Sequence, residues 1–493
     1  MIEKTIDELV YYARVHLDLD FEDEIYFKNI LLHLFNKDTP YIGEIDKEAI
    51  EKLSVPDTLI QQIIDSEVKE NGLSEEEAFL KADFILGLLS PTPSKVNEKF
   101  FSLLKNGDKD AMNYLYDLSI ANGYFQKTKV DQNLEWNASF SDGPSLKITI
   151  NLSKPEKNNK DIAKLLTKVS SDYPKCRLCH DNLGFYGDAK KPARSTIRFI
   201  PLTLAGEKWY FQYSPYGYFK KHGICFKDEH TPMHIEHKTF VRLLDFVDMF
   251  PSFFLGSNSD LPIVGGSILD HEHFQGGLPV LPIFDAKNLE EVYHSDKNTT
   301  VSILDFYLSV LKIEGENRED VIAQADKILD SWLTYDDLEN EIISNENGVR
   351  HNAITLISHK KDGKYNLYLL LRNNRTNDKY PEGIFHAHPE YFSIKHEGIG
   401  LIEAAGLFIL PARLKRQIQE AKNSAVLPEK EYLAKYPDMK DFSDMINAIK
   451  GGETAEEYIN NVCRNILRNV AVFKDTEKGK QGFKKFVNKV FEE

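Results

Sequence analysis

The sequence predicts an α+β protein, with a mostly helical N-terminal region followed by two halves of antiparallel sheet and flanking helices. Two observations predict this class. Apolar residues recur three or four positions apart near the N-terminus, whereas short strand-like segments between turn signals follow from about residue 146. We expect a helical N-terminal region over 1–145, a first half over 146–330, and a second half with C-terminal helices over 331–493.

The N-terminal region has helical spacing in stretches such as IDELVYYARVHL (6–17) and FEDEIYFKNILLHLF (21–35). Ser74 precedes a run of glutamates as a helix N-cap would, and PTPS at 91–94 ends that segment. No catalytic motif falls here. We therefore expect this region to be a scaffold or an interface.

Strand signals dominate both halves. Ala205-Gly206 and Asp362-Gly363 each separate two such segments and predict hairpin turns. A helix is expected over 238–250, and helices with basic, solvent-facing sides are expected after Pro411. The segments expected as strands are LKITINL (146–152), TIRFIPLTL (196–204), EKWYFQYS (207–214), NAITLIS (352–358) and NLYLLLR (366–372).

The composition of the chain argues against several classes of function. A formal charge of -16 argues against nucleic acid as a partner. The chain starts without a signal-peptide pattern and has no apolar run of membrane-spanning length, so we expect a cytoplasmic protein that does not enter membranes. Two of the four cysteines form one CxxC, which favours metal binding over a disulfide framework.

The stretch GGSILDHEHFQGG (265–277) carries the chemistry. On a strand, residues two apart share a face, so His271, His273 and Gln275 would line one surface. Flanking glycines allow a ligand to approach the backbone closely. A neutral imidazole can attack a nucleotide phosphorus, and the middle residue of the trio, His273, is the candidate nucleophile.

Gln275 limits the kinds of leaving group that the site can serve. An amide cannot supply a proton, so the motif suits a leaving group that needs no acid, such as a sugar phosphate, whose second pKa is about 6. The alternative interpretation is a pair of core histidines beside a glycine turn.

Several motif blocks together resemble the second bacterial class of galactose-1-phosphate uridylyltransferases. The resemblance covers about 170–415 and implies two halves related to the histidine-triad fold. It also implies exchange between UDP-glucose and galactose 1-phosphate through a uridylyl-histidine, as in the Leloir pathway of galactose metabolism. A homodimer is a family expectation, and no organic cofactor is expected. The blocks are CRLCHDNLGFYG, PARSTIRFIPL, QYSPYGYF, SNSDLPIVGGSILDHEHFQGG and GIFHAHPEYFSIKHEGIGLIEAAGLFILPARL.

The resemblance also assigns roles to residues. The family's nucleophile falls on His273, and the glutamine that steadies the transferring group falls on Gln275. Lys395 and Glu403 are expected to reach the hexose phosphate and hydroxyls respectively. The other expected substrate contacts are Asn258, Gly265, Gly266, Ser267, Arg194 and Arg198, where the two arginines could equally be surface residues of a strand.

The resemblance implies a metal set as well. It predicts a zinc site of two thiolates and two imidazoles, formed by Cys176, Cys179, His230 and His271. A reduced CxxC without metal is the alternative. A further metal site is suggested by His351, His386 and His388, against the alternative of core or substrate-facing histidines.

Two rival functions remain open. A histidine-triad nucleotide hydrolase or dinucleotide phosphorylase would use the same central histidine without needing a hexose 1-phosphate. A zinc-stabilised interaction module without catalysis would need only the CxxC, and it would leave Gln275 and the glycines unexplained.

Overall fold

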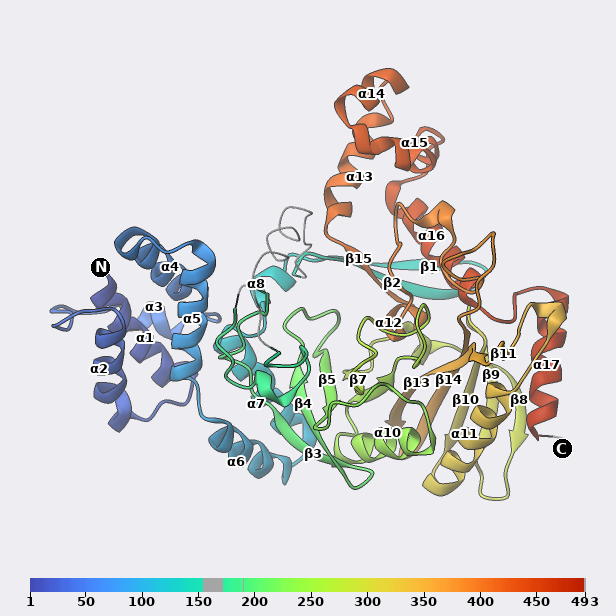
Figure 1. Cartoon of the computed structure of the whole chain (residues 1–493), viewed down its shortest axis with the longest axis horizontal. Helices are drawn as coiled ribbons and strands as arrows, with labels where there is room; N and C mark the ends of the chain where they lie inside the picture. Colours follow the sequence, from blue (N-terminus) through green and yellow to red (C-terminus); the bar gives the residue numbers. More distant parts are fainter. Residues whose placement is uncertain (154–171, 189, 492–493) are drawn as a thin grey trace.

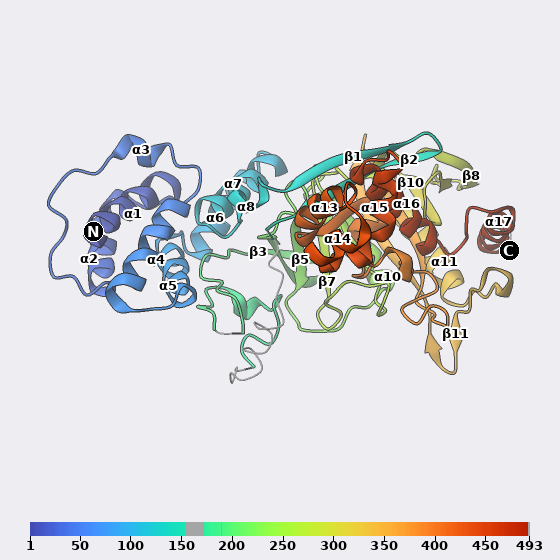
Figure 2. The same ribbon diagram turned by 90° about the horizontal axis from the view of Figure 1, so that it is seen from above.

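The computed structural model describes residues 1–153, 172–188 and 190–491. It confirms an α+β fold with antiparallel sheets and a helical N-terminal region. The N-terminal helices form one end of an elongated molecule, and the C-terminal helix lies at the other end (Figures 1 and 2). None of the described helices is long and apolar enough to cross a membrane.

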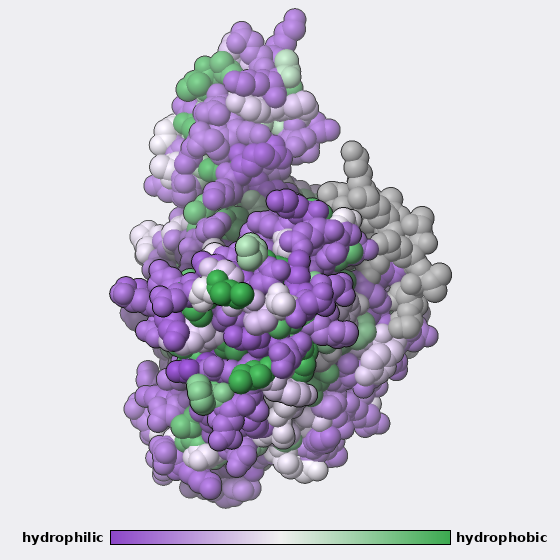
Figure 3. Space-filling model, turned by 90° about the vertical axis from the view of Figure 1, so that its left-hand side faces the viewer, coloured by the Kyte–Doolittle hydropathy of each residue, from purple (hydrophilic) through white to green (hydrophobic). Residues whose placement is uncertain are grey.

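The N-terminal helices are α1 (Ile2–His16), α2 (Glu24–Leu34), α3 (Lys47–Glu51), α4 (Asp57–Asn71), α5 (Glu75–Leu89), α6 (Pro93–Leu104), α7 (Asp108–Ala121) and α8 (Lys127–Val130). Ser74 caps α5 as expected: its hydroxyl accepts from the Glu77 amide at 3.3 Å, and the Glu77 carboxylate accepts from the Ser74 amide at 3.0 Å. Seen end-on, this region is largely hydrophilic with small, separate apolar spots (Figure 3).

The helical region ends earlier than predicted. Strand β1 (Leu134–Phe140) lies inside the range 1–145 and pairs with β2 (Gly143–Asn151) in a tight hairpin. Its sequence LEWNASF alternates apolar and polar residues, with Trp136, Ala138 and Phe140 less exposed than the residues between them, so the strand pattern was present in the sequence and was missed.

A ten-stranded antiparallel sheet forms the centre of the molecule, in the order β3-β4-β5-β7-β6-β13-β14-β10-β9-β8. Both predicted hairpin turns are confirmed, because Ala205-Gly206 and Asp362-Gly363 have the paired positive φ values of type I′ turns. The strands are β3 (Ile200–Leu204), β4 (Glu207–Tyr213), β5 (Gly223–Lys227), β6 (Phe254–Ser257), β7 (His273–Gly277), β8 (Asn288–His294), β9 (Thr300–Leu304), β10 (Val310–Gly315), β13 (Asn352–Lys361) and β14 (Lys364–Asn373).

The sheet consists of two units with the same topology. In each unit three strands precede a helix and two follow it, and the fourth strand of the unit lies innermost. The helices are α10 (His237–Met249) and α11 (Arg318–Leu333). The fourth strands, β6 and β13, pair with each other and join the units.

This topology changes the predicted division of the second and third regions. Strands β8 to β10 fall within the predicted first half (146–330), yet β10 pairs with β14 of the second unit, and β9 and β8 follow β10 in the sheet. We propose a boundary between β7 and β8 in place of 330/331. Local sequence could not reveal it, since strand pairing depends on residues far apart in the chain.

A smaller sheet lies over one face of the large one (Figure 1). Strand β15 (Leu407–Pro411) runs parallel to β2 and joins the β1-β2 hairpin. The hairpin of β11 (Asn345–Glu346) and β12 (Val349–Arg350) is separate. The remaining helices are α12 (Leu401–Ala404), α13 (Arg413–Ser424), α14 (Glu429–Lys435), α15 (Ser443–Lys450), α16 (Ala455–Val470) and α17 (Glu477–Phe491).

The C-terminal helix α17 is more than a solvent-facing basic segment. Phe483 and Phe486 are buried, and the Phe486 ring meets Trp332 and Tyr335 edge-on at 5.2 and 4.9 Å. Its lysines face outward while one apolar stripe packs against the end of α11, as expected for an amphipathic helix.

His359 on β13 provides a pH test of this core. Its ring lies against Phe284 and Tyr368, and burial lowers its pKa to about 4. An unfolded histidine titrates near 6.5, so the unfolded chain binds this proton first as the pH falls. The stability due to neutral His359 is therefore complete above about pH 6.5 and declines as the pH falls towards about 4.

We predict that His359→Phe makes the melting temperature less dependent on pH between about 6.5 and 4, because one group that must protonate on unfolding is gone. Thermal unfolding followed by circular dichroism across this range checks it. An unchanged slope would contradict the assignment.

Candidate active site

Strand β7 places core residues on one side and polar chemistry on the other, as predicted. Phe274 stacks on Trp209 at 4.8 Å on the side of α10, and the Glu272 carboxylate accepts from Arg242 of α10 at 2.7 Å. His273 and Gln275 therefore face the opposite side. His271 precedes the first residue of β7 and belongs to the same alternation.

His273 is held in one tautomer. Its side chain is 6% exposed, and Nδ1 lies 2.8 Å from the backbone oxygen of His271. A carbonyl only accepts, so Nδ1 carries the proton and Nε2 keeps a free lone pair. Burial lowers the pKa of His273 and favours the neutral ring. This is the form that a nucleophilic imidazole needs.

A pocket of about 880 Å³ opens beside this strand, between the two units. Gln275 is part of its wall, whereas His273 is buried just next to it on the same strand face. Extending the β6-β7 register by two residues places Asn258 opposite His273. The predicted residues that line the pocket are Asn258, Gly265, Gly266, Ser267, Gln275, His386, Lys395 and Glu403.

Asn258 fixes the shape of the pocket wall. Its Oδ1 accepts from the backbone amide of Leu401 at 2.8 Å and so connects the two sides of the pocket. A Cβ at Gly266 would lie 2.8 Å from Asn258 Nδ2, so a larger residue there would have to displace the Asn258 amide. A Cβ at Gly265 would meet the carbonyl oxygens of Ser259 and Leu261 at 2.6 Å. Close packing against the backbone therefore requires glycine at 265, and a side chain at 266 would disturb Asn258.

Lys395 and Glu403 reach the pocket, but as a pair. Lys395 Nζ donates to Glu403 Oε1 at 2.9 Å and to the Ile409 carbonyl at 3.1 Å. The lysine is 4% exposed. In this structure the two residues satisfy each other's charge, because a buried charge requires a partner. Their expected contacts with the hexose phosphate and hydroxyls stay predictions.

The structure does not bring Arg194 or Arg198 to this pocket. Arg198 is buried and donates to backbone oxygens of Gly87, Pro91, Ser195 and Ile197 at 2.7 to 3.0 Å. Burial lowers its pKa to about 10. It fastens the N-terminal helices to the segment before β3. Arg194 donates to the adjacent carbonyl and lies over the Tyr124 ring.

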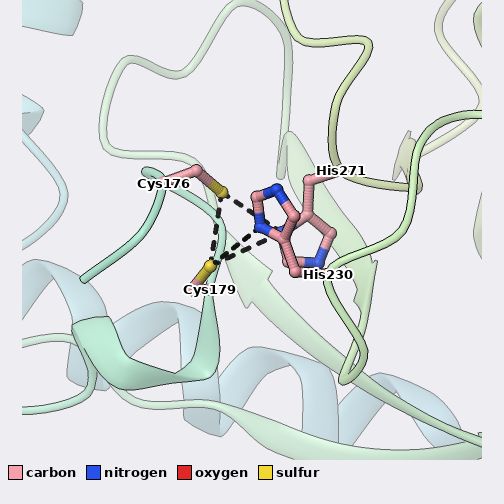
Figure 4. A group of neighbouring side chains, drawn as sticks. All are labelled: Cys176, Cys179, His230 and His271. Atoms are coloured by element: carbon pink, nitrogen blue, oxygen red, sulfur yellow. Dashed lines mark hydrogen bonds between the residues drawn. The ribbon is translucent and has the colours of Figure 1, made fainter. Parts of the chain in front are cut away.

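The four predicted metal ligands converge (Figure 4). Cys176, Cys179, His230 and His271 offer atoms that all lie within 4.8 Å of one another. Cys176 Sγ lies 3.2 Å from His271 Nδ1, and Cys179 Sγ lies 3.2 Å from His230 Nδ1. Tetrahedral zinc separates its donor atoms by about 3.3 to 3.8 Å, so the cluster fits a metal with little movement.

His271 is prepared for this role by its second nitrogen. Its Nε2 lies 2.8 Å from the Lys227 carbonyl and must donate to it, so the Nδ1 lone pair faces the thiols. This is the outer hydrogen bond that usually orients a metal-binding histidine.

The further metal site is not formed in the part of the chain that the structure describes. There, no group of ligand atoms other than the Cys/His cluster converges. His351 Nδ1 lies 2.8 Å from the Asn374 side-chain oxygen, and His388 Nε2 donates to the Ile384 carbonyl at 3.1 Å. His386 lines the pocket, and burial lowers its pKa to about 4. The alternative of core and substrate-facing histidines suits these contacts.

Comparison with known proteins decides the family. Residues 18–232 match the profile of the galactose-1-phosphate uridyl transferase N-terminal domain. A galactose-1-phosphate uridylyltransferase from Caldanaerobacter subterraneus subsp. tengcongensis is 42% identical over 98% of this chain and 96% of its own length. This chain belongs to the galactose-1-phosphate uridylyltransferase family. Another relative of that name, from Clostridium acetobutylicum, is 39% identical over 99% of this chain and all of its own length.

Galactose-1-phosphate uridylyltransferases are nucleotidyltransferases, and this member contains two five-stranded units of the same topology. Yeast Ap4A phosphorylase, a solved structure, has a TM-score of 0.35 at 12% identity, over 71% of this chain and 92% of its own.

Sequence reasoning missed His222 in this uridylyltransferase. It precedes β5, and its Nε2 lies 3.0 Å from Gln275 Oε1. The only signal was a single histidine in KKHGICF, which is uninformative without knowing that β5 pairs with β7.

We predict that Arg242→Met lowers the free energy of unfolding by about 3 kcal/mol, because it leaves Glu272 buried without its main partner. Urea unfolding followed by tryptophan fluorescence measures this. The double variant Arg242→Met/Glu272→Met should recover part of the loss, since no buried charge remains unpaired. A loss of under about 1 kcal/mol in the single variant would contradict the role of the pair.

Proposed function

We propose that this chain transfers a uridylyl group from UDP-glucose to galactose 1-phosphate, giving UDP-galactose and glucose 1-phosphate. The observation that carries the proposal is His273 itself, a buried neutral imidazole with a free Nε2, one strand pleat from Gln275 in the pocket wall. Membership of the family supports the same activity.

The reaction proceeds in two displacements. The Nε2 lone pair of His273 attacks the α-phosphorus of UDP-glucose, and the bond to the bridging oxygen breaks, so glucose 1-phosphate leaves with the electron pair. A phosphate oxygen of galactose 1-phosphate then attacks the same phosphorus, and the phosphorus–nitrogen bond breaks. Throughout the reaction, Nδ1 keeps its proton and donates a hydrogen bond to the His271 carbonyl. Neither leaving group needs an acid, which explains an amide at Gln275.

The pocket suits these substrates. Its volume of about 880 Å³ lies within the range of small-molecule sites, about 300 to 1,000 Å³. Gly265, Gly266 and Ser267 supply a stretch of the pocket wall without bulky side chains. The Lys395–Glu403 pair also lines the pocket and would offer a cation and a carboxylate to the sugar phosphate.

The rival functions have less support. A hydrolase or dinucleotide phosphorylase needs water or inorganic phosphate as acceptor, and relatives at 42% and 39% identity carry the transferase name. An interaction module without catalysis leaves the His273 tautomer and the pocket without a purpose. A cytoplasmic location, a homodimer and the absence of nucleic-acid partners stay predictions.

We predict that UDP-glucose alone adds one uridylyl mass to the protein, on the peptide that contains His273, and that His273→Ala abolishes both the adduct and the transfer. His386 and His396 also line the pocket, so peptide mapping is needed to place the adduct on His273. Intact-mass spectrometry with peptide mapping measures the adduct. Release of UMP without an adduct would support the hydrolase instead, and full activity of His273→Ala would reject the nucleophile.

We also propose zinc as the metal of the Cys/His cluster. Two thiolates and two imidazoles are a common closed set for structural zinc. Cys176, Cys179 and His230 would then hold His271, and through it the start of β7, in place. The metal supplies rigidity there and no step of the transfer.

We predict about one zinc per chain by elemental analysis, and less than about a tenth of that in Cys176→Ser, because a hydroxyl is a poor zinc ligand. The melting temperature should fall with the metal. Cys463→Ser is the matched control, since Cys463 is a buried cysteine on α16 outside the cluster. Active, stable protein without metal would refute the assignment.

A further inference from the structure

We propose that His222 is a positioning residue of the transfer, which holds the Gln275 carboxamide with its N–H bonds directed at the transferring phosphoryl group. The inference rests on the proposed function and extends it by one residue. His222 Nε2 lies 3.0 Å from Gln275 Oε1. Gln275 lines the pocket and His222 does not, so His222 acts only through the glutamine.

The protonation of His222 sets the direction of this hydrogen bond. Burial lowers the pKa of His222 to about 4, so the ring is neutral near pH 7 and carries a single N–H. Its Nδ1 is buried without a partner among the described residues. If Gln275 were flipped, its NH₂ would donate to Nε2 and the ring proton would move to Nδ1, as a buried N–H without an acceptor. Such orphan donors are rare, so Nε2 donates to Oε1.

Ring contacts and backbone hydrogen bonds hold the His222 ring in one position. It stacks on Tyr218 at 5.1 Å and lies against Phe219 at 4.6 Å. Its backbone is fixed at both ends, because its amide donates to the Phe219 carbonyl at 3.1 Å and its carbonyl accepts from the Ser214 amide at 2.8 Å. The imidazole is therefore a rigid donor behind the pocket wall.

The orientation matters because a carboxamide has two ends of opposite polarity and nearly equal shape. With Oε1 held by His222, the NH₂ group faces the pocket and can donate to phosphoryl oxygens. A flipped amide would present its oxygen to those negative oxygens and repel them. Donors fixed before the reaction cost no reorganisation during it, which is the main source of such stabilisation.

The test is His222→Phe, which keeps an aromatic ring of similar size and removes the donor. We expect kcat for transfer to fall about tenfold, the equivalent of one lost hydrogen bond, with the KM for UDP-glucose changed less than about twofold. His222→Gln should restore most of the rate, because its amide nitrogen can occupy the position of Nε2. The unaltered protein must first form its uridylyl adduct with UDP-glucose.

A double-mutant cycle separates positioning from general damage. In a Gln275→Ala background, His222→Phe should cause no further loss, because the group it positions is gone. His359→Phe, assayed at pH 7.5, is the matched control. It also replaces a buried histidine that lies against a tyrosine, but away from the pocket, and should leave kcat unchanged.

Three outcomes would overturn the inference. They are an unchanged kcat in His222→Phe, an equal loss in both backgrounds, and a His222→Gln variant no better than His222→Phe. If the unaltered protein formed no adduct, the proposed function would fail first and this inference with it. An adduct together with any of the three outcomes would reject only the role of His222.

Discussion

The pairing of β6 with β13 is the interaction on which the site depends. It joins two units of identical topology edge to edge, in the register that sets Ser257 against Leu356. Gly256 permits this approach, since a Cβ there would lie 2.5 Å from the Leu356 carbonyl oxygen. Asn258 leaves β6 at this seam and bonds to Leu401 across it. The pocket exists because the seam brings these two parts of the chain together.

Strand β7 holds the two residues proposed to act in the transfer. One face of the strand is fixed to α10 through Trp209 and Arg242, so the other face can hold His273 and Gln275 without depending on a ligand. Each polar group there has a defined partner: a carbonyl for His273 and an imidazole for Gln275. The Cys/His cluster includes His271, two residues before the strand. Rigid support from several sides is what preorganised sites require.

The sequence predicted the features that depend on near neighbours. The hairpin at Asp362-Gly363, the cap at Ser74 and the shared face of His273 and Gln275 all follow from local spacing and turn chemistry. Among the features that depend on distant contacts, the family resemblance predicted the Cys/His cluster, but several others were missed. No local pattern shows that β8 joins the second unit or that His222 lies beside Gln275. No local pattern shows either that Arg198 donates to a carbonyl of the N-terminal helices.

The parallel pairing of β15 with β2 has a consequence for synthesis. Leu407 pairs with Lys147, so one small sheet unites segments made early and late. The pocket wall likewise includes residues up to Arg413. The chain must therefore be synthesised beyond Arg413 before the pocket wall can form. Until then, β1 and β2 lack their third strand. Nascent chains that end before β15 would contain the HEHFQ strand but no complete pocket. The unpaired edge of β2 would be exposed in such chains, and chaperones commonly cover exposed edges of this kind.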